Sequence, residues 1–289
     1  MLVRLGPQSA GAPSNFPATV KPDRNVVFTE TIPENYDRYL GPVIFEPYAE
    51  DLVARLRDKQ LERVLEIACG TGIVTRRMRS ALPAKTEIIA TDLNPDMFEL
   101  AKAKFKKDEN VRWQQADASA LPFPDASFDA VVCQFGLMFV PDKSAAMRES
   151  FRVLRKGGLF LFNVWDSLEA NAFGQIAHAV IGSFFDRDPP KFYEIPFSLH
   201  DSKVVRELLR NAGFEKVELF IETRALRGKS AKEFATGLVL GNPTGPELIE
   251  RGVNTGQVIT AVAQCLTERY GATPLEGSMS ALVWEGKRP

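Results

Sequence analysis

Residues 64–72 have the sequence VLEIACGTG. The apolar run before Ala68 predicts a buried strand, and Gly70 and Gly72 predict a tight turn directly after it. Because glycine has no Cβ, a ligand can lie close to the backbone of such a turn, and the helix expected next offers unpaired N–H groups. The stretch therefore predicts a strand, turn and helix that hold a nucleoside-like ligand.

Further apolar runs follow the same alternation with helical stretches. This pattern is typical of parallel strands joined by crossovers, so it predicts a doubly wound α/β sheet of the Rossmann-like kind. The segments VELFIETRAL (217–226) and SMSALVWEG (278–286) predict a sixth and a seventh strand at one edge, and an antiparallel seventh strand remains open. The first five predicted strands are 62–67, 86–92, 111–116, 128–135 and 157–165.

Two helix boundaries carry polar signals. Asn94 is expected to cap the helix after the second strand, with Pro95 in its first turn. Asp142 is expected to cap the helix after the fourth strand, and that helix is expected to end at Gly157-Gly158.

Composition and charge limit the function classes. The 289 residues are 45% hydrophobic and carry 36 basic against 37 acidic side chains, which predicts small-molecule partners and no binding to nucleic acid. The three cysteines are far apart without a CxxC motif, so we expect no zinc site and a cytoplasmic location. No run approaches the roughly 18 apolar residues of a membrane span.

The chain divides into an arm and a single domain. Residues 1–31 are rich in Pro, Gly, Ser and Ala and predict a flexible arm, and residues 32–289 predict one domain. Its core is expected at 58–166, 200–227 and 277–287. Helical segments at 32–56, 167–199 and 228–276, called the lid segments below, are expected to cover the carboxyl ends of the strands, where open α/β sheets bind ligands.

Asp92 ends the second predicted strand, 20 residues after Gly72. A carboxylate in this place can accept hydrogen bonds from both hydroxyls of a ribose. A nicotinamide dinucleotide fits this pair, but its fingerprint has a third glycine where this chain has Thr75. Glu66 at the end of the first strand would also repel a pyrophosphate, whereas it suits a ligand with an ammonium or sulfonium group.

Asp117 and Ala118 follow the third predicted strand. The carboxylate can accept a hydrogen bond from an adenine amine, and the backbone N–H of Ala118 can donate to a ring nitrogen. With the glycine turn and Asp92, these groups outline an adenosine without phosphate, which predicts S-adenosylmethionine.

Five segments in order and spacing resemble the class I S-adenosylmethionine-dependent methyltransferases. They are LEIACGTG, ATDLNPDM, QADASALPFPDASFD, FDAVVCQFGLMFVPD and RVLRKGGLF, and the similarity is strongest over residues 32–166. The chain looks most like the branch with ubiquinone- and menaquinone-type C-methyltransferases and other small-molecule enzymes. The loop departs from the usual DxGxGxG pattern, with Glu66 in place of Asp.

The resemblance implies a role for individual residues. The methionine part of the cofactor would be held at the glycine loop, the ribose at the end of the second strand and the adenine after the third. Gln134 and Phe135 would face the sulfonium, and two tyrosines would cover the methionine carboxylate. The implied cofactor-binding residues are Tyr36, Tyr39, Glu66, Ala68, Gly70, Gly72, Asp92, Leu93, Met97, Asp117, Ala118, Gln134 and Phe135.

The acceptor is less constrained. His178 lies between Gly174 and Gly182 in the second lid segment and is the candidate general base, although a lone histidine is more often a packing or surface residue. Aromatic residues of this segment, with Phe135, Met138 and Phe139, predict an apolar pocket. We therefore expect in-line methyl transfer to an O, N or C atom of a small apolar or aromatic molecule. A nicotinamide-dependent oxidoreductase and a non-catalytic cofactor-binding module remain alternatives.

Overall fold

The computed structural model describes residues 27–29 and 31–289. The predicted arm at residues 1–31 therefore lies outside the described residues, apart from 27–29 and 31. Phe28, within this short described stretch, is buried.

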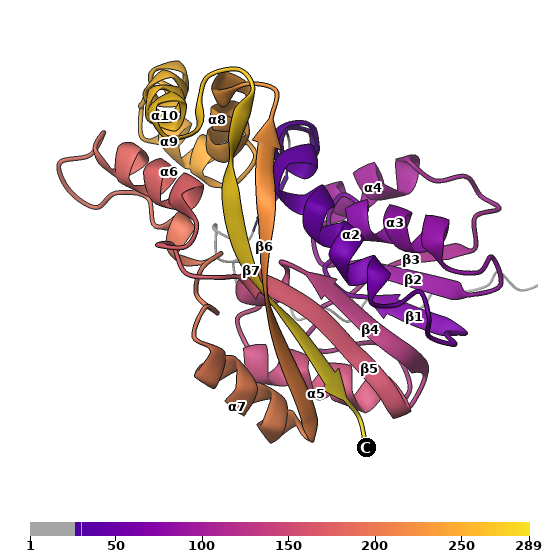
Figure 1. The fold of residues 1–289 in the computed structure, drawn as a ribbon. Helices are drawn as coiled ribbons and strands as arrows, with labels where there is room; N and C mark the ends of the chain where they lie inside the picture. Colours follow the sequence, from indigo (N-terminus) through magenta and orange to yellow (C-terminus); the bar gives the residue numbers. More distant parts are fainter. Residues whose placement is uncertain (1–26, 30) are drawn as a thin grey trace, which may run out of the picture.

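Within the described residues, seven strands form one sheet in the order β3-β2-β1-β4-β5-β7-β6 (Figure 1). Strands β1 to β5 pair in parallel, and β7 runs antiparallel to both β5 and β6. The predicted doubly wound sheet is confirmed, and the seventh strand is the antiparallel one. The strands are β1 (Arg63–Glu66), β2 (Glu87–Asp92), β3 (Val111–Gln115), β4 (Phe128–Gln134), β5 (Leu154–Trp165), β6 (Lys216–Gly228) and β7 (Leu275–Lys287).

The central strands are buried on both faces because helices cover each side. Alternate residues of β4 enter different clusters: Ala130 and Val132 pack with Val74 and Met78 of α3, and Val131 faces the opposite cluster. Figure 1 shows α2 and α3 on one side of the sheet and α5 and α7 on the other. The helices are α1 (Ile32–Asn35), the π-helix η2 (Tyr36–Phe45), α2 (Glu46–Ala54), α3 (Ile73–Ala81), α4 (Pro95–Ala103), the 3-10 helix η3 (Leu137–Phe139), α5 (Lys143–Val153), α6 (Ala172–Gly182), the 3-10 helix η4 (Phe192–Glu194), α7 (Ser202–Ala212), α8 (Ala231–Leu240), α9 (Thr244–Glu250) and α10 (Thr255–Tyr270).

The predicted end of one helix and the predicted side-chain cap of another need correction, although α4 begins at Pro95 as predicted. Asp142 caps α5, accepting from the Ala145 N–H over 2.8 Å, but the helix ends at Val153, because Leu154 already pairs with Phe128 as the start of β5. Asn94 precedes α4 without capping it. Its side-chain oxygen accepts the backbone N–H of Phe28 instead.

Strands β6 and β7 are longer than their neighbours. Strand β5 ends at Trp165, opposite Ala281, so residues 275–280 of β7 pair only with β6 beyond the carboxyl end of β5. Helices α8, α9 and α10 connect the far ends of these two strands (Figure 1). The third lid segment therefore lies beyond the carboxyl ends of the parallel strands.

The sequence of the first lid segment predicts one short and one longer helix, but the structure has one continuous helical stretch from α1 through η2 into α2. Its middle part contains Pro42 and is wound as a π-helix. Lys104, just after α4, forms an ion pair with Asp37 of η2 and donates to the Thr71 carbonyl over 2.9 Å. This contact fixes η2 beside the loop that follows β1.

Candidate functional site

The loop after β1 has an unusual backbone. Ala68, Gly70 and Gly72 have φ angles of 52°, 54° and 79°, all in the left-handed region that favours glycine. Gly136, after β4, lies so close that a Cβ there would come within 2.4 Å of the Ala68 Cβ. The loop therefore turns sharply at the carboxyl end of β1, held against the end of β4.

Asp92 fixes this loop to the end of β2. One carboxylate oxygen accepts the Gly70 N–H and the other accepts the Asn94 N–H, each over 2.8 Å. Burial raises the pKa of Asp92 above its ordinary value, while these backbone donors favour the charged form. A carboxylate oxygen has two lone-pair sites, so each can accept a further hydrogen bond from a ligand.

Glu66 lies buried beneath the same loop. Its carboxyl group accepts a hydrogen bond from the Thr75 hydroxyl over 2.5 Å. Burial is the largest influence and raises the pKa of Glu66 to about 8, against the opposing effect of the Thr75 hydrogen bonds. The residue at the third-glycine position of a dinucleotide fingerprint thus anchors this carboxyl group.

Three adjoining cavities meet at the carboxyl edge of the sheet. The large cavity, of about 390 Å³, lies against the ends of β2, β3 and β4. The loop cavity, of about 30 Å³, lies against Glu66 and Thr71. The aromatic pocket, of about 60 Å³, lies beneath the lid segments. Tyr36 of η2 lines all three, so its side chain lies where the three cavities meet.

Most residues predicted to bind the cofactor line these cavities. Gln134 lies between the large and loop cavities, and Phe135 lies between the large cavity and the aromatic pocket. The predicted residues that the structure brings together are Tyr36, Glu66, Ala68, Gly70, Asp92, Leu93, Met97, Asp117, Ala118, Gln134 and Phe135.

Two residues predicted to bind the cofactor lie elsewhere in the described structure. Gly72 directly precedes α3, and its missing Cβ lets Ala101 of α4 approach closely. Tyr39 packs against Gly237 of α8, with the Arg38 guanidinium over its ring. Neither residue is among those lining the three cavities.

His178 also lies away from the cavities. Phe173, on the same helix α6, does line the aromatic pocket. His178 comes five residues later, so its side chain is rotated by about 140° around the helix axis from that of Phe173. Its Nδ1 is buried without a hydrogen-bond partner among the described residues. Gly174, one of the two glycines that flank this histidine, admits the Phe197 ring, which lies 2.6 Å from where a Cβ would be.

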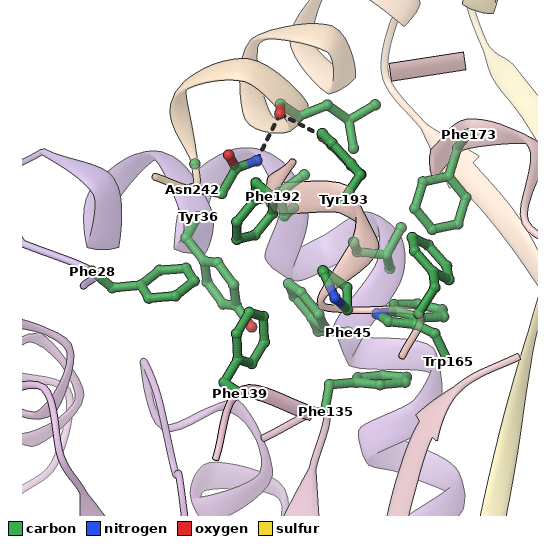
Figure 2. Close-up of a pocket in the computed structure, with 16 residues that line it drawn as sticks. Phe28, Tyr36, Phe45, Phe135, Phe139, Trp165, Phe173, Phe192, Tyr193 and Asn242 are labelled. Carbon is green, nitrogen blue, oxygen red and sulfur yellow. Dashed lines mark hydrogen bonds between the residues drawn. The ribbon is translucent and has the colours of Figure 1, made fainter. Parts of the chain in front are cut away.

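The aromatic pocket is built from several elements (Figure 2). The Phe135 ring stacks on Trp165 with centroids 4.0 Å apart and planes 9° apart, and Tyr36 stacks on Phe45 at 4.5 Å. The Tyr193 hydroxyl donates to the Leu238 carbonyl over 2.6 Å, joining the second and third lid segments. The side chains of the pocket therefore present mainly ring faces and edges.

Sequence reasoning missed several of these residues. Trp165 ends β5 at the ligand-binding edge, a position that could have identified it, and Phe45 is hidden within an apolar helix. Asn94 was assigned to a cap and Phe28 to the arm. Two further aromatic residues of the second lid segment, Phe184 and Phe185, pack outside the pocket.

Two negative findings concern the described residues alone. Within 27–29 and 31–289, no helix is long and apolar enough to cross a membrane. The same residues contain no group of three or more His, Cys, Asp or Glu side chains placed to hold a metal ion.

Comparison with known proteins bears on this site. A family model described as "Methyltransferase domain" matches residues 65–162, which run from β1 into β5. The chain is 30% identical over 175 residues to the ubiquinone/menaquinone biosynthesis C-methyltransferase UbiE of Pectobacterium carotovorum, covering 55% of this chain and 68% of that protein. It is 28% identical over 203 residues to the demethylmenaquinone methyltransferase of Staphylococcus haemolyticus, covering 66% and 85%.

A solved structure agrees in fold. Phosphoethanolamine N-methyltransferase 2 of Haemonchus contortus, in complex with phosphomonomethylethanolamine and S-adenosylhomocysteine, superposes with a TM-score of 0.59 at 16% identity. The superposition covers 95% of this chain and 61% of that one. The matches favour a methyltransferase over the nicotinamide-dependent oxidoreductase that the glycine loop also allowed. The chain belongs to the class I S-adenosylmethionine-dependent methyltransferases and is a methyltransferase of small molecules whose methyl donor is S-adenosylmethionine.

Proposed function

We propose that this enzyme transfers the methyl group of S-adenosylmethionine to an O, N or C atom of a small apolar or aromatic acceptor bound in the aromatic pocket. The observation that carries the proposal is the direct contact of this pocket with the large cavity, since Phe135, Phe139 and Tyr36 line both.

The adenosine part of the cofactor would occupy the large cavity. Asp92 offers free lone pairs to the ribose hydroxyls, and Met97 lies at 5% exposure along the wall, where it would pack on the adenine. Asp117 accepts hydrogen bonds from the N–H and hydroxyl of Ser119 through one oxygen, which leaves the other oxygen for an adenine amine.

The methionine part would occupy the loop cavity, whose polar atoms fit it. Thr71 Oγ1 and Gln134 Oε1 are buried and have no hydrogen-bond partner among the described residues. Such atoms are costly unless a ligand pairs with them. Beside Glu66, the amide oxygen suits an ammonium group and the hydroxyl suits a carboxylate.

The residues of this chain act on the reaction mainly by positioning. S-adenosylmethionine supplies a methyl group activated by its positively charged sulfur. Phe135 and Tyr36 would hold the acceptor atom in line with that methyl group, and the surrounding rings would exclude water. In-line displacement requires no covalent enzyme intermediate.

The names of the two relatives support an acceptor with a ring. One is a ubiquinone/menaquinone biosynthesis C-methyltransferase and the other a demethylmenaquinone methyltransferase. The ring faces of the aromatic pocket favour flat apolar molecules for the same physical reason, since aromatic pairs pack well when offset or edge to face.

The proposal is tested by supplying methyl-labelled S-adenosylmethionine with phenols, anilines and quinols, each paired with its sulfonated counterpart. We expect label to enter uncharged members and to be absent from sulfonated ones, because burying an unpaired charge is costly. Equal labelling of both sets, or labelling of neither, would contradict the proposed acceptor class.

A matched pair of variants locates the acceptor. Phe192→Leu removes a ring that lines the aromatic pocket, whereas Phe184→Leu makes the same change outside it. We expect KM for the acceptor to rise in the first variant alone, with the affinity for S-adenosylhomocysteine unchanged in both.

A further inference from the structure

Phe28 occupies a particular place in the site. Its ring is buried, with 7% of the residue exposed, and it lines both the large cavity and the aromatic pocket. Its backbone N–H donates to Asn94 Oδ1 over 3.3 Å. The residue is thus attached to the same strand end that carries Asp92.

Three rings from three elements surround the Phe28 ring. Tyr36 of η2 lies 6.1 Å away at 89°, Phe139 of η3 lies 5.6 Å away at 85°, and Phe192 of η4 lies 6.4 Å away at 67°. These are the edge-to-face arrangements that aromatic pairs prefer. Figure 2 shows Phe28 at the side of the pocket, pointing towards Tyr36.

Asn94 connects this ring to the predicted ribose site. Its backbone N–H donates to Asp92 Oδ1 over 2.8 Å, while its side chain accepts from Phe28 and leaves α4 without a side-chain cap. One residue therefore contacts both the carboxylate expected to hold the ribose and the segment that closes the aromatic pocket.

We propose that Phe28 is a specificity-determining residue that separates the acceptor pocket from the donor cavity. Asn94 holds it in place, so that occupation of the ribose site and closure of the acceptor pocket favour each other. This inference rests on the proposed function, because it takes the aromatic pocket as the acceptor site.

The physical argument concerns water and shape. The aromatic pocket is small, at about 60 Å³, and the large cavity beside it is about 390 Å³. Removal of the shared ring would join the two spaces and admit solvent to the acceptor side. An acceptor would then lose both a contact surface and the restraint that keeps it in line with the methyl group.

The first test needs no acceptor. The chain has three tryptophans, of which Trp165 lines the aromatic pocket at 4% exposure and Trp284 is fully buried. In a Trp113→Phe background, acrylamide quenching of tryptophan fluorescence reports access to Trp165. We expect quenching to increase in Phe28→Ala. In Phe28→Tyr, which restores a ring, quenching should return to the value of the Trp113→Phe background.

Leu93→Ala is the matched control, since Leu93 lines the large cavity but not the aromatic pocket. It should leave quenching unchanged. Addition of S-adenosylhomocysteine should reduce quenching in the background protein, and this reduction should be lost in Asn94→Ala. Equal quenching of Phe28→Ala and its background would overturn the inference.

The second test uses the labelled-methyl assay with phenol as the probe. We expect Phe28→Ala to raise KM for phenol and to lower kcat by up to about 100-fold, the range for a misplaced reactant. Phe28→Tyr should recover most of the activity, and Phe184→Leu, which changes a ring outside the pocket, should keep the kinetics of the unaltered enzyme. Unaltered kinetics in Phe28→Ala would refute the role.

The two proposals can fail separately. If the unaltered enzyme methylates neither phenol nor any other uncharged acceptor, the proposed acceptor class is wrong, and the quenching test still decides whether Phe28 closes the pocket. If phenol is methylated and Phe28→Ala behaves as the unaltered enzyme does, only the inference about Phe28 is wrong.

Discussion

Thr75 donates a hydrogen bond to Glu66 over 2.5 Å, and both side chains are buried below the glycine loop. The pair places an acidic group, with its pKa raised to about 8, where the ammonium of the cofactor is expected. Such a group costs stability while it is charged without a cation beside it, and the ammonium of a bound cofactor would supply that partner.

The first prediction concerns the stability of the cofactor-free protein. The folded-state pKa of Glu66, about 8, lies above its ordinary value of 4.5. The carboxyl group therefore stabilises the fold most below pH 4.5, and this contribution is lost as pH rises towards 8. Above pH 8, the free energy of unfolding of Glu66→Gln should exceed that of the unaltered protein by about 2–4 kcal/mol.

Urea denaturation of both proteins between pH 5 and pH 9 measures this effect. The difference between Glu66→Gln and the unaltered protein should grow with pH. A difference that stays constant over this range would show that Glu66 is not the titrating group.

The second prediction concerns cofactor affinity. Since an ammonium group binds the charged carboxylate, affinity for S-adenosylhomocysteine should increase as pH rises towards 8 and decline at higher pH, once the ligand's own amine loses its proton. Glu66→Gln should weaken binding by about 10- to 100-fold, as expected for a lost hydrogen bond to a charged group. Calorimetry across the pH range checks both, and a pH-independent affinity in the unaltered protein contradicts them.

The third prediction compares the two carboxylates of the large cavity. Asp92→Ala removes the ribose acceptor together with the partner of the Gly70 and Asn94 N–H groups, so most cofactor binding should be lost. Asp117→Ala should cost about 1–3 kcal/mol, the range for one buried hydrogen bond. Calorimetry with S-adenosylhomocysteine measures both.

Ser119→Ala serves as the control, because it removes a partner of Asp117 without altering a residue that lines the cavity. Its affinity should stay close to that of the unaltered protein. Full affinity in Asp92→Ala would refute the assignment of the ribose site.

The fourth prediction concerns His178. Because this side chain is not among those lining the aromatic pocket, His178→Ala should retain kcat, KM and the pH dependence of kcat. Phe173→Leu on the same helix should raise KM for the acceptor, since Phe173 does line the pocket. A large loss of kcat in His178→Ala alone would restore the histidine as a base.

The alternation of strands and helices, and the acidic residues at the strand ends, followed from local patterns. Asp92 and Asp117 each follow an apolar strand, and the carboxyl ends of neighbouring parallel strands meet at one edge, so their convergence could be predicted. The misassigned cap at Asn94 shows where this reasoning fails. Its sequence signal is the same whether the side chain bonds to its own helix or to Phe28, 66 residues away.

The acceptor side could not be predicted in this way. His178 and Phe173 lie on one short helix, and only the packing of α6 decides which of them lines the pocket. Ring contacts such as Phe135 with Trp165 join strand ends that are 30 residues apart. The sequence by itself determined the parallel sheet, the glycine loop and the acids at the strand ends, because these depend on short-range patterning. The gathering of Phe28 and the aromatic residues of the lid segments around one pocket became visible only in the tertiary structure, because it depends on contacts between segments with no shared periodicity.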